Sequence, residues 1–260
     1  MKRDYKRFSI SIKERIAVLR ITRIKKKNAI DTIMINEISD ICRFLNNDEN
    51  IGAVIIIGSA DIFSSGGDIG DWGSLSTNDF VNSWLREGNL AFDALAGLKQ
   101  PVIAVLNGPT LGGGLELAAC ADYRIGEVGC EIGQPETLLG VIPGWSGTQR
   151  LRHRFGGQIV RRMAIFGEIF SAEDSFTLGL IDQIEETGDG LNAAISLAKR
   201  ILKRGQLATQ VTKMLINYDE QDGRSKTLEM LAGQLIHPGD EVREGIQAFS
   251  EKRPPNHNKT

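Results

Sequence analysis

Two glycine clusters and two glutamates are the residues of this chain that are best suited to chemistry. Each cluster follows a short apolar run: the first is FSSGGDI at 63–69, and the second is LGGGLEL at 111–117. Glycines leave backbone N–H groups unshielded, so two such loops from neighbouring strands could direct two N–H groups at one oxygen, as in an oxyanion hole. The alternative is that these glycines only permit tight turns and close helix packing.

Two carboxylates accompany the second cluster. Glu116 falls in the first turn of a helix that the triple glycine begins, where a glutamate can also serve only the helix dipole. Glu136 follows Gln134-Pro135 within an apolar stretch, so it is either a helix-starting acid or a functional group in a pocket. Two carboxylates near an oxyanion hole suit proton transfer next to a carbonyl, with an enolate-like transition state.

Several other kinds of site are excluded. The sequence has no GK[ST] phosphate loop, no GxGxxG and no HExxH pair, and Gly144-Trp145-Ser146-Gly147 is one residue short of a nucleophile elbow. His153 lies among arginines, which predicts a surface position. Cys42, Cys120 and Cys130 form no CxxC pair, so we expect buried thiols, no disulfide framework and no metal site.

The elements that must position these residues belong to an α/β fold. Residues 53–57 and 102–106 are apolar throughout and end at turn signals, which predicts strands buried on both faces. Alternating apolar residues between Phe8 and Val18 predict strands with one wet face. Helical spacing is found near 80–98, from Gly113, over 191–202 and over 228–235. We therefore expect an α/β core over 1–190 and a helical region over 191–260.

Composition is that of a soluble globular protein. The 260 residues are 41% hydrophobic and 25% charged, and no run of 18 apolar residues predicts a membrane span. Residues 1–27 hold eleven Lys/Arg and two acids, so they carry +9 of a total charge of −2. Their strand pattern favours a folded segment of a cytoplasmic protein over a targeting peptide, and an RNA-binding role is a weaker alternative. Lys25-Lys26-Lys27 then lie in a loop, either solvated or facing an anionic ligand.

At this point the chain resembles the crotonase (enoyl-CoA hydratase/isomerase) family over nearly its whole length, and within it the enoyl-CoA hydratases. The blocks that carry the resemblance are NAI at 28–30, FSSGGDI at 63–69, PVIAVLNGPTLGGGLELAAC at 101–120, QPETLLGVIPGWSGTQRL at 134–151 and EGIQAFSEKR at 244–253. Several spaced blocks in one order make a specific match. The resemblance implies a crotonase-like ββα superhelical core with a C-terminal helical trimerisation region.

The resemblance also implies roles for individual residues. Gly67 and Gly113 would donate their N–H groups to the thioester oxygen. Glu116 would activate water for addition to Cβ, and Glu136 would supply the proton to Cα. The CoA contacts would be Lys25, Ala29, Ser65, Gly67, Asp68 and Ile69, with Phe249 and Lys252 reaching the nucleotide of a neighbouring subunit.

The expected activity is reversible hydration of a 2,3-trans-enoyl-CoA, with the acyl-CoA as substrate and no metal or redox cofactor. The expected assembly is a homotrimer or a dimer of trimers, with no nucleic-acid or membrane partner. Alternatives are an enoyl-CoA isomerase or specialised dehydratase of the same family, and a non-catalytic CoA-binding subunit; Lys252 can also be a solvated tail residue.

Departures from the family pattern bear on the substrate. Gly67 replaces the usual alanine, and Gly70 stands where typical hydratases have a lysine for CoA. Trp145 replaces a small residue. Its side chain would either reshape the acyl pocket, stack on an unsaturated or aromatic acyl group, or pack outward against the next helix.

Overall fold

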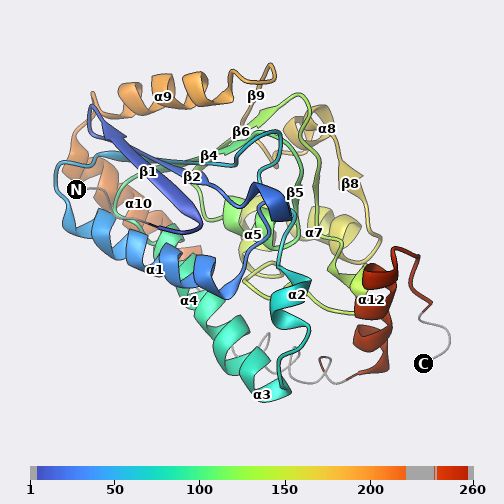
Figure 1. Ribbon diagram of the computed structural model, residues 1–260. Helices are drawn as coiled ribbons and strands as arrows, with labels where there is room; N and C mark the ends of the chain where they lie inside the picture. Colours follow the sequence, from blue (N-terminus) through green and yellow to red (C-terminus); the bar gives the residue numbers. More distant parts are fainter. Residues whose placement is uncertain (1–4, 221–236, 238, 257–260) are drawn as a thin grey trace.

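A six-stranded sheet forms the centre of the computed structural model, which describes residues 5–220, 237 and 239–256 (Figure 1). The strand order is β1-β2-β3-β4-β6-β9, with β1 antiparallel to β2 and every other pair parallel. The strands are β1 (Phe8–Lys13), β2 (Ile16–Ile21), β3 (Ala53–Ile57), β4 (Val102–Leu106), β6 (Tyr123–Glu127) and β9 (Gln183–Glu185). Because the parallel strands point the same way, the loops that follow β3 and β4 leave the sheet at the same edge.

Helices cover both faces of this sheet, which explains the continuous apolar runs. On β3, Val54 and Ile56 face a core that includes residues of α1 (Thr32–Asn47) and α4 (Arg86–Ala96). Ile55 and Ile57 face the other way, towards Ala194 and Ala198 of α9 (Gly190–Ile201). Figure 1 shows α9 on one side of the sheet and α1 with α4 on the other.

A second, three-stranded sheet continues from the first. It consists of β5 (Thr110–Leu111), β7 (Ile132–Gly133) and β8 (Ile169–Phe170), in the order β5-β7-β8. Helix α5 (Gly113–Ala118) follows β5 directly, and the 3₁₀ helix η3 (Glu136–Leu139) follows β7. The second sheet therefore positions the segments that carry Glu116 and Glu136.

The remaining helices surround these sheets. They are η1 (Ile24–Lys26), α2 (Ile69–Trp72), α3 (Thr77–Asp79), η2 (Phe80–Leu85), α6 (Arg150–Phe155), α7 (Gly157–Ala164), α8 (Ala172–Thr177), α10 (Gln206–Glu220) and α12 (Asp240–Glu251). Every helix within the described ranges is too short or too polar to cross a membrane.

Most of the expected elements are present. The strands at 53–57 and 102–106 are buried along their whole length, and the helix at 191–202 is α9. The helix expected near 80–98 is divided, since η2 is a π-helix that leads into α4. The helix expected over 228–235 lies outside the described residues. The division of the chain at residue 190 stays a prediction.

Three details of the sequence analysis can be compared with the structure. The three cysteines are buried and unpaired, as expected. His153 is exposed, also as expected. The expectation that β2 has one face exposed to solvent is wrong, since all its residues are buried or half-buried. The reason is that β2 lies between two other strands and under helices on both faces.

Candidate active site

The backbone N–H groups of Gly67 and Gly113 lie side by side where the loops after β3 and β4 meet. A Cβ atom on Gly113 would lie 3.4 Å from the nitrogen of Gly67. A bridge between Ile30 and Gly67 holds the first loop, and Gly112 N–H donates to Gly133 O at 2.9 Å to hold the second. Within the described residues, neither Gly67 N–H nor Gly113 N–H has a protein acceptor. The pair is therefore available to an oxygen of a ligand.

Glycine is required in this loop for steric reasons as well. Gly112 has φ +52° and ψ −126°, a conformation that L-residues with a side chain rarely adopt. A Cβ atom at Gly112 would also lie 2.8 Å from Oε1 of Glu136, and one at Gly114 would lie 2.5 Å from Ser64 O. Close packing of these glycines is thus present in the structure, and it is compatible with the oxyanion-hole role, which stays a prediction.

Glu116 is buried in α5 and is held by a backbone donor. Only 2% of the surface of Glu116 is exposed, and Trp145 N–H donates to its Oε1 at 2.8 Å. A Cβ atom at Gly147 would lie 2.5 Å from the same Oε1, so a side chain there would displace the carboxylate. The loop that contains Trp145 and Gly147 therefore fixes the orientation of Glu116.

Glu136 begins η3 directly after Pro135, and its surroundings are unlike those of Glu116. Its Oε2 is buried and has no hydrogen-bond partner among the described residues. Burial raises the pKa of the Glu136 carboxyl to about 7, because a charged carboxylate is poorly solvated there. Glu136 can therefore hold a proton near neutral pH and release it, as a general acid must.

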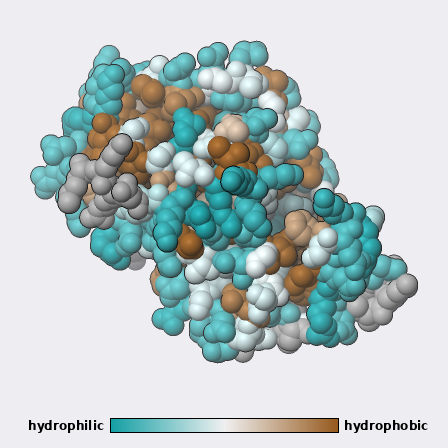
Figure 2. Space-filling view, in the orientation of Figure 1, coloured by the Kyte–Doolittle hydropathy of each residue, from teal (hydrophilic) through white to brown (hydrophobic). Residues whose placement is uncertain are grey.

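Helix α12 holds η3 in place. The backbone of Gly245 packs so closely on Leu139 O that a Cβ atom at 245 would collide with it, and Gly140 packs on the backbone of Glu241 in the same way. The side chain of Ile246 also approaches Gly73, which ends α2. Figure 2 shows hydrophobic side chains gathered between α2 and α12. The C-terminal helix therefore helps to form the surroundings of Glu136.

The residues expected to bind CoA fall into two groups, and the first surrounds Gly67. Lys25 is exposed on η1, whereas Ala29 is buried and Ser65 half-buried, with Ser65 N–H bonded to Lys27 O. Asp68 caps α2 through Gly70 N–H and forms an ion pair with Arg23 at 2.6 Å; Ile69 is the first residue of α2. The Asp68 carboxylate is thus already engaged within the chain.

The second group lies at the end of α12. Phe249 is 60% exposed, and Lys252 is exposed in the left-handed conformation that ends the helix. Among the described residues, no hydrogen bond or ion pair joins either side chain to the group around Gly67. Their assignment to a neighbouring subunit's ligand stays a prediction.

Sequence reasoning missed the amide of Gln134. Gln134 is fully buried, and in the described structure neither its Oε1 nor its Nε2 has a hydrogen-bond partner. A Cβ atom at Gly147 would lie 2.5 Å from both Gln134 Nε2 and Glu116 Oε1. An amide so placed can bond to a ligand or water beside Glu116. The feature of the sequence that could have indicated Gln134 is its position two residues before Glu136.

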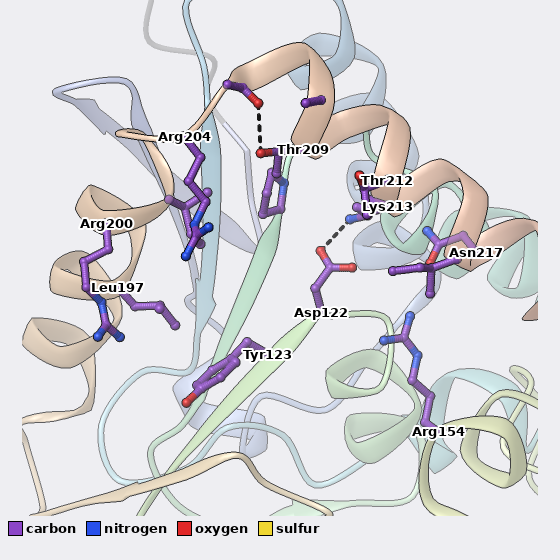
Figure 3. A pocket seen from close by; sticks show the side chains of 15 residues that line it. Asp122, Tyr123, Arg154, Leu197, Arg200, Arg204, Thr209, Thr212, Lys213 and Asn217 are labelled. Atoms are coloured by element: carbon purple, nitrogen blue, oxygen red, sulfur yellow. Dashed lines mark hydrogen bonds and ion pairs between the residues drawn. The ribbon is translucent and has the colours of Figure 1, made fainter.

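A separate pocket of about 840 Å³ lies between α9 and α10 (Figure 3). Its lining includes Tyr123, Arg200 and Arg204, and an ion pair of 2.6 Å between Lys213 Nζ and Asp122 ties α10 to the sheet. It contains no residue of the predicted site.

The fold and the site geometry can now be compared with known proteins. A family model described as enoyl-CoA hydratase/isomerase matches residues 11–260. The crotonyl-CoA hydratase of Syntrophomonas wolfei is 34% identical over 255 residues, which cover 97% of this chain and 98% of the relative. The short-chain-enoyl-CoA hydratase of Clostridium acetobutylicum is 30% identical over 243 residues, or 92% of each chain.

A solved structure gives the same result for the fold. The carnitinyl-CoA hydratase of Mycobacterium avium superposes with a TM-score of 0.84 at 25% identity, over 98% of this chain and 99% of that one. The crotonase-like fold expected from the sequence is confirmed. The chain therefore belongs to the enoyl-CoA hydratase/isomerase, or crotonase, family of enzymes.

Proposed function

We propose that this enzyme is a hydro-lyase that adds water reversibly to a 2,3-trans-enoyl-CoA thioester. The observation that carries the proposal is the pair of unlike carboxylates beside two open N–H donors. Glu116 is held by a backbone donor, while buried Glu136 keeps a proton up to a pKa of about 7. Chemistry that adds water across a double bond needs one base and one acid.

Each group has one role in the proposed step. Glu116 accepts a proton from water, whose oxygen forms a bond to Cβ. The electron pair of the double bond moves towards the thioester carbonyl, and the N–H groups of Gly67 and Gly113 stabilise the enolate-like oxygen. Glu136 then gives its proton to Cα, which completes the 3-hydroxyacyl thioester. Proton exchange with solvent restores both glutamates.

The substrate class rests on the surroundings of the donor pair and on the relatives. Exposed Lys25 suits a CoA phosphate, and we assign the CoA contacts to the group around Gly67 together with Phe249 and Lys252. Two relatives that align over at least 92% of this chain are named hydratases of enoyl-CoA thioesters. The proposed reaction requires no metal or redox cofactor, because the thioester itself activates the double bond.

The test is the loss of the conjugated enoyl-thioester absorbance when purified enzyme is added to crotonyl-CoA. We expect rapid loss with the wild type and a fall of about 10²–10⁴-fold in both Glu116→Gln and Glu136→Gln. Glutamine keeps the size of each side chain, so circular dichroism should stay unchanged. Phe249→Ala, away from the carboxylates, should alter KM more than kcat.

Other results would contradict the proposal in identifiable ways. Dependence on only one of the two glutamates, with migration of the double bond, would indicate an isomerase. CoA binding without turnover of any enoyl thioester would indicate a binding subunit. If both glutamine variants hydrated the substrate at the wild-type rate, neither carboxylate would take part in the mechanism.

We also propose that the enzyme self-associates as a homotrimer or a dimer of trimers. Helix α10 supports this, since it exposes large apolar side chains that a second copy could cover. These are Leu207, Val211, Met214, Leu215 and Ile216. Sedimentation equilibrium of the wild type should give three or six times the chain mass, and Leu215→Glu should lower it. A monomer at micromolar concentration would contradict the proposal.

The cytoplasmic location inferred from the sequence stays a proposal, tested by fractionation of the source cells.

A further inference from the structure

The indole of Trp145 lies against the two proposed oxyanion donors. Trp145 is 2% exposed, so it does not pack outward on the surface. A Cβ atom on Gly113 would lie 2.6 Å from Cζ3 of the indole, and one on Gly67 would lie 3.6 Å from Cη2. The indole therefore occupies the space that side chains at positions 67 and 113 would otherwise fill.

Other residues hold the indole there. Its Nε1–H donates to Trp84 O at 3.1 Å. The centroid of the indole lies 4.8 Å from the ring centroid of Trp84 and 5.1 Å from that of Phe92, and both rings are tilted relative to the indole. Gly88 on α4 is essential to this arrangement, because a Cβ atom there would collide with Nε1. With two close aromatic rings and one hydrogen bond, the indole is fixed rather than free to turn away.

The position of the indole limits the space for an acyl group. The backbone N–H of Trp145 holds Glu116, so the residue that orients the proposed base also places its side chain beside the donors. In the proposed reaction, a carbonyl oxygen bound by Gly67 and Gly113 would place Cα and Cβ within reach of Glu116 and Glu136. An acyl chain that continues past Cβ towards α4 then meets the indole and the rings behind it.

We propose that Trp145, supported by Trp84 and Phe92, closes the acyl end of the site and makes the enzyme selective for short enoyl thioesters of about four carbons. This inference rests on the proposed hydratase function and adds its substrate class. It also decides between the roles considered for Trp145: the ring is a wall for the acyl group, not a platform that stacks on an aromatic one.

The test compares kcat/KM for crotonyl-, trans-2-hexenoyl-, trans-2-octenoyl- and cinnamoyl-CoA. In the wild type we expect crotonyl-CoA to be preferred over octenoyl-CoA by at least about 100-fold, since each methylene that does not fit costs about tenfold or more and octenoyl-CoA has four more than crotonyl-CoA. Trp145→Ala should raise the octenoyl-to-crotonyl ratio at least about tenfold. Phe8→Ala removes a buried ring on β1 and should leave that ratio unchanged.

A second variant covers the case in which Trp145→Ala does not fold. Trp145→Phe keeps an aromatic ring but is smaller, so it should raise the hexenoyl-to-crotonyl ratio by a few-fold. An unchanged ratio in the folded tryptophan variants, equal use of C4 and C8 substrates by the wild type, or a preference for cinnamoyl-CoA would overturn the inference.

Binding separates this inference from the proposed reaction. Calorimetry with the saturated thioesters butyryl-CoA and octanoyl-CoA involves no chemistry. Tighter binding of butyryl-CoA by the wild type, reversed in Trp145→Ala, would support the acyl wall even if no enoyl thioester were hydrated. Equal binding of both thioesters by the two proteins would overturn the wall while leaving hydration to be judged by the absorbance assay.

Discussion

Glu116 and Glu136 are positioned by opposite means. Glu116 lies on α5, between the triple glycine and the core, and receives a hydrogen bond from the backbone of Trp145. Glu136 lies at the start of a short 3₁₀ helix, and its Oε2 receives no hydrogen bond in the described structure. The carboxylate of Glu116 is oriented by a backbone donor from a distant loop, whereas the protonation of Glu136 is governed mainly by its removal from water.

This difference teaches how one fold can separate a base from an acid of the same chemical type. A backbone N–H can only donate, so it suits a carboxylate oxygen that accepts. A carboxyl group that is removed from water retains its proton more strongly, which is why burial raises the pKa of Glu136 to about 7. Unlike surroundings of this kind support the unlike roles that we propose for the two glutamates.

The largest expected effect comes from removing both carboxylates. If the two glutamates act in a single step, the kcat of the double variant Glu116→Gln/Glu136→Gln should be about 10⁴-fold below that of the wild type. That value should be only slightly below the kcat of the less active single variant. The measurement is kcat for crotonyl-CoA in all four proteins. Losses that multiply would show that the two glutamates act independently.

Gly112 packs against the carboxyl of Glu136, so Gly112→Ala should displace it. The new Cβ atom would lie 2.8 Å from Oε1 of Glu136, and a displaced carboxyl should lower kcat by about 100-fold. Gly156→Ala is the matched control: Gly156 also has a positive φ, of +88°, but nothing lies within 4 Å of its added Cβ atom. Both variants should have a lower melting temperature than the wild type, but only Gly112→Ala should show the fall of about 100-fold in kcat.

The pH dependence of the reaction should report the proton on Glu136. Because the proton donor must be protonated and its pKa is about 7, kcat/KM for hydration should fall about tenfold between pH 7.5 and pH 8.5. Dehydration starts from the same singly protonated pair with the proton on Glu116, so its kcat/KM should fall over the same range. If kcat/KM fell with pH for hydration but not for dehydration, or the reverse, the two directions would not depend on one shared proton.

A smaller effect is expected where α12 packs on η3. In Gly245→Ala the added Cβ atom would push α12 away from Leu139 O and admit water near Glu136. The pKa of Glu136 should then move from about 7 towards 4.5, so the fall in kcat/KM should begin about one pH unit lower. Gly129→Ala, with open space around its added Cβ atom, should leave the profile unchanged.

The sequence predicted the elements whose contact with the core gives a regular pattern of apolar residues. Strands β3 and β4 and helix α9 follow from apolar spacing alone, because burial on two faces or on one stripe leaves a periodic trace. It also singled out Glu116 and Glu136 as candidate catalytic residues from their places after glycine and proline; their roles stay a prediction.

What could not be predicted depends on contacts between distant segments. The place of Trp145 is decided by Gly88, about 60 residues earlier, and the burial of Glu136 is completed by Gly245, about 110 residues later. No local pattern records either contact. The π-helix before α4 is similar, since helical spacing near residue 80 does not distinguish it from an α-helix.

The packing of α12 on η3 also has a consequence for the order of synthesis. Both glycine loops and both glutamates leave the ribosome well before residues 240–251, and at 5–20 residues per second the delay after Glu136 is roughly 5–20 s. During that interval the nascent chain can form the loops that carry Gly67 and Gly113, but η3 still lacks the helix that packs on it. The surroundings of Glu136 are therefore completed only after residues 240–251 have been synthesised.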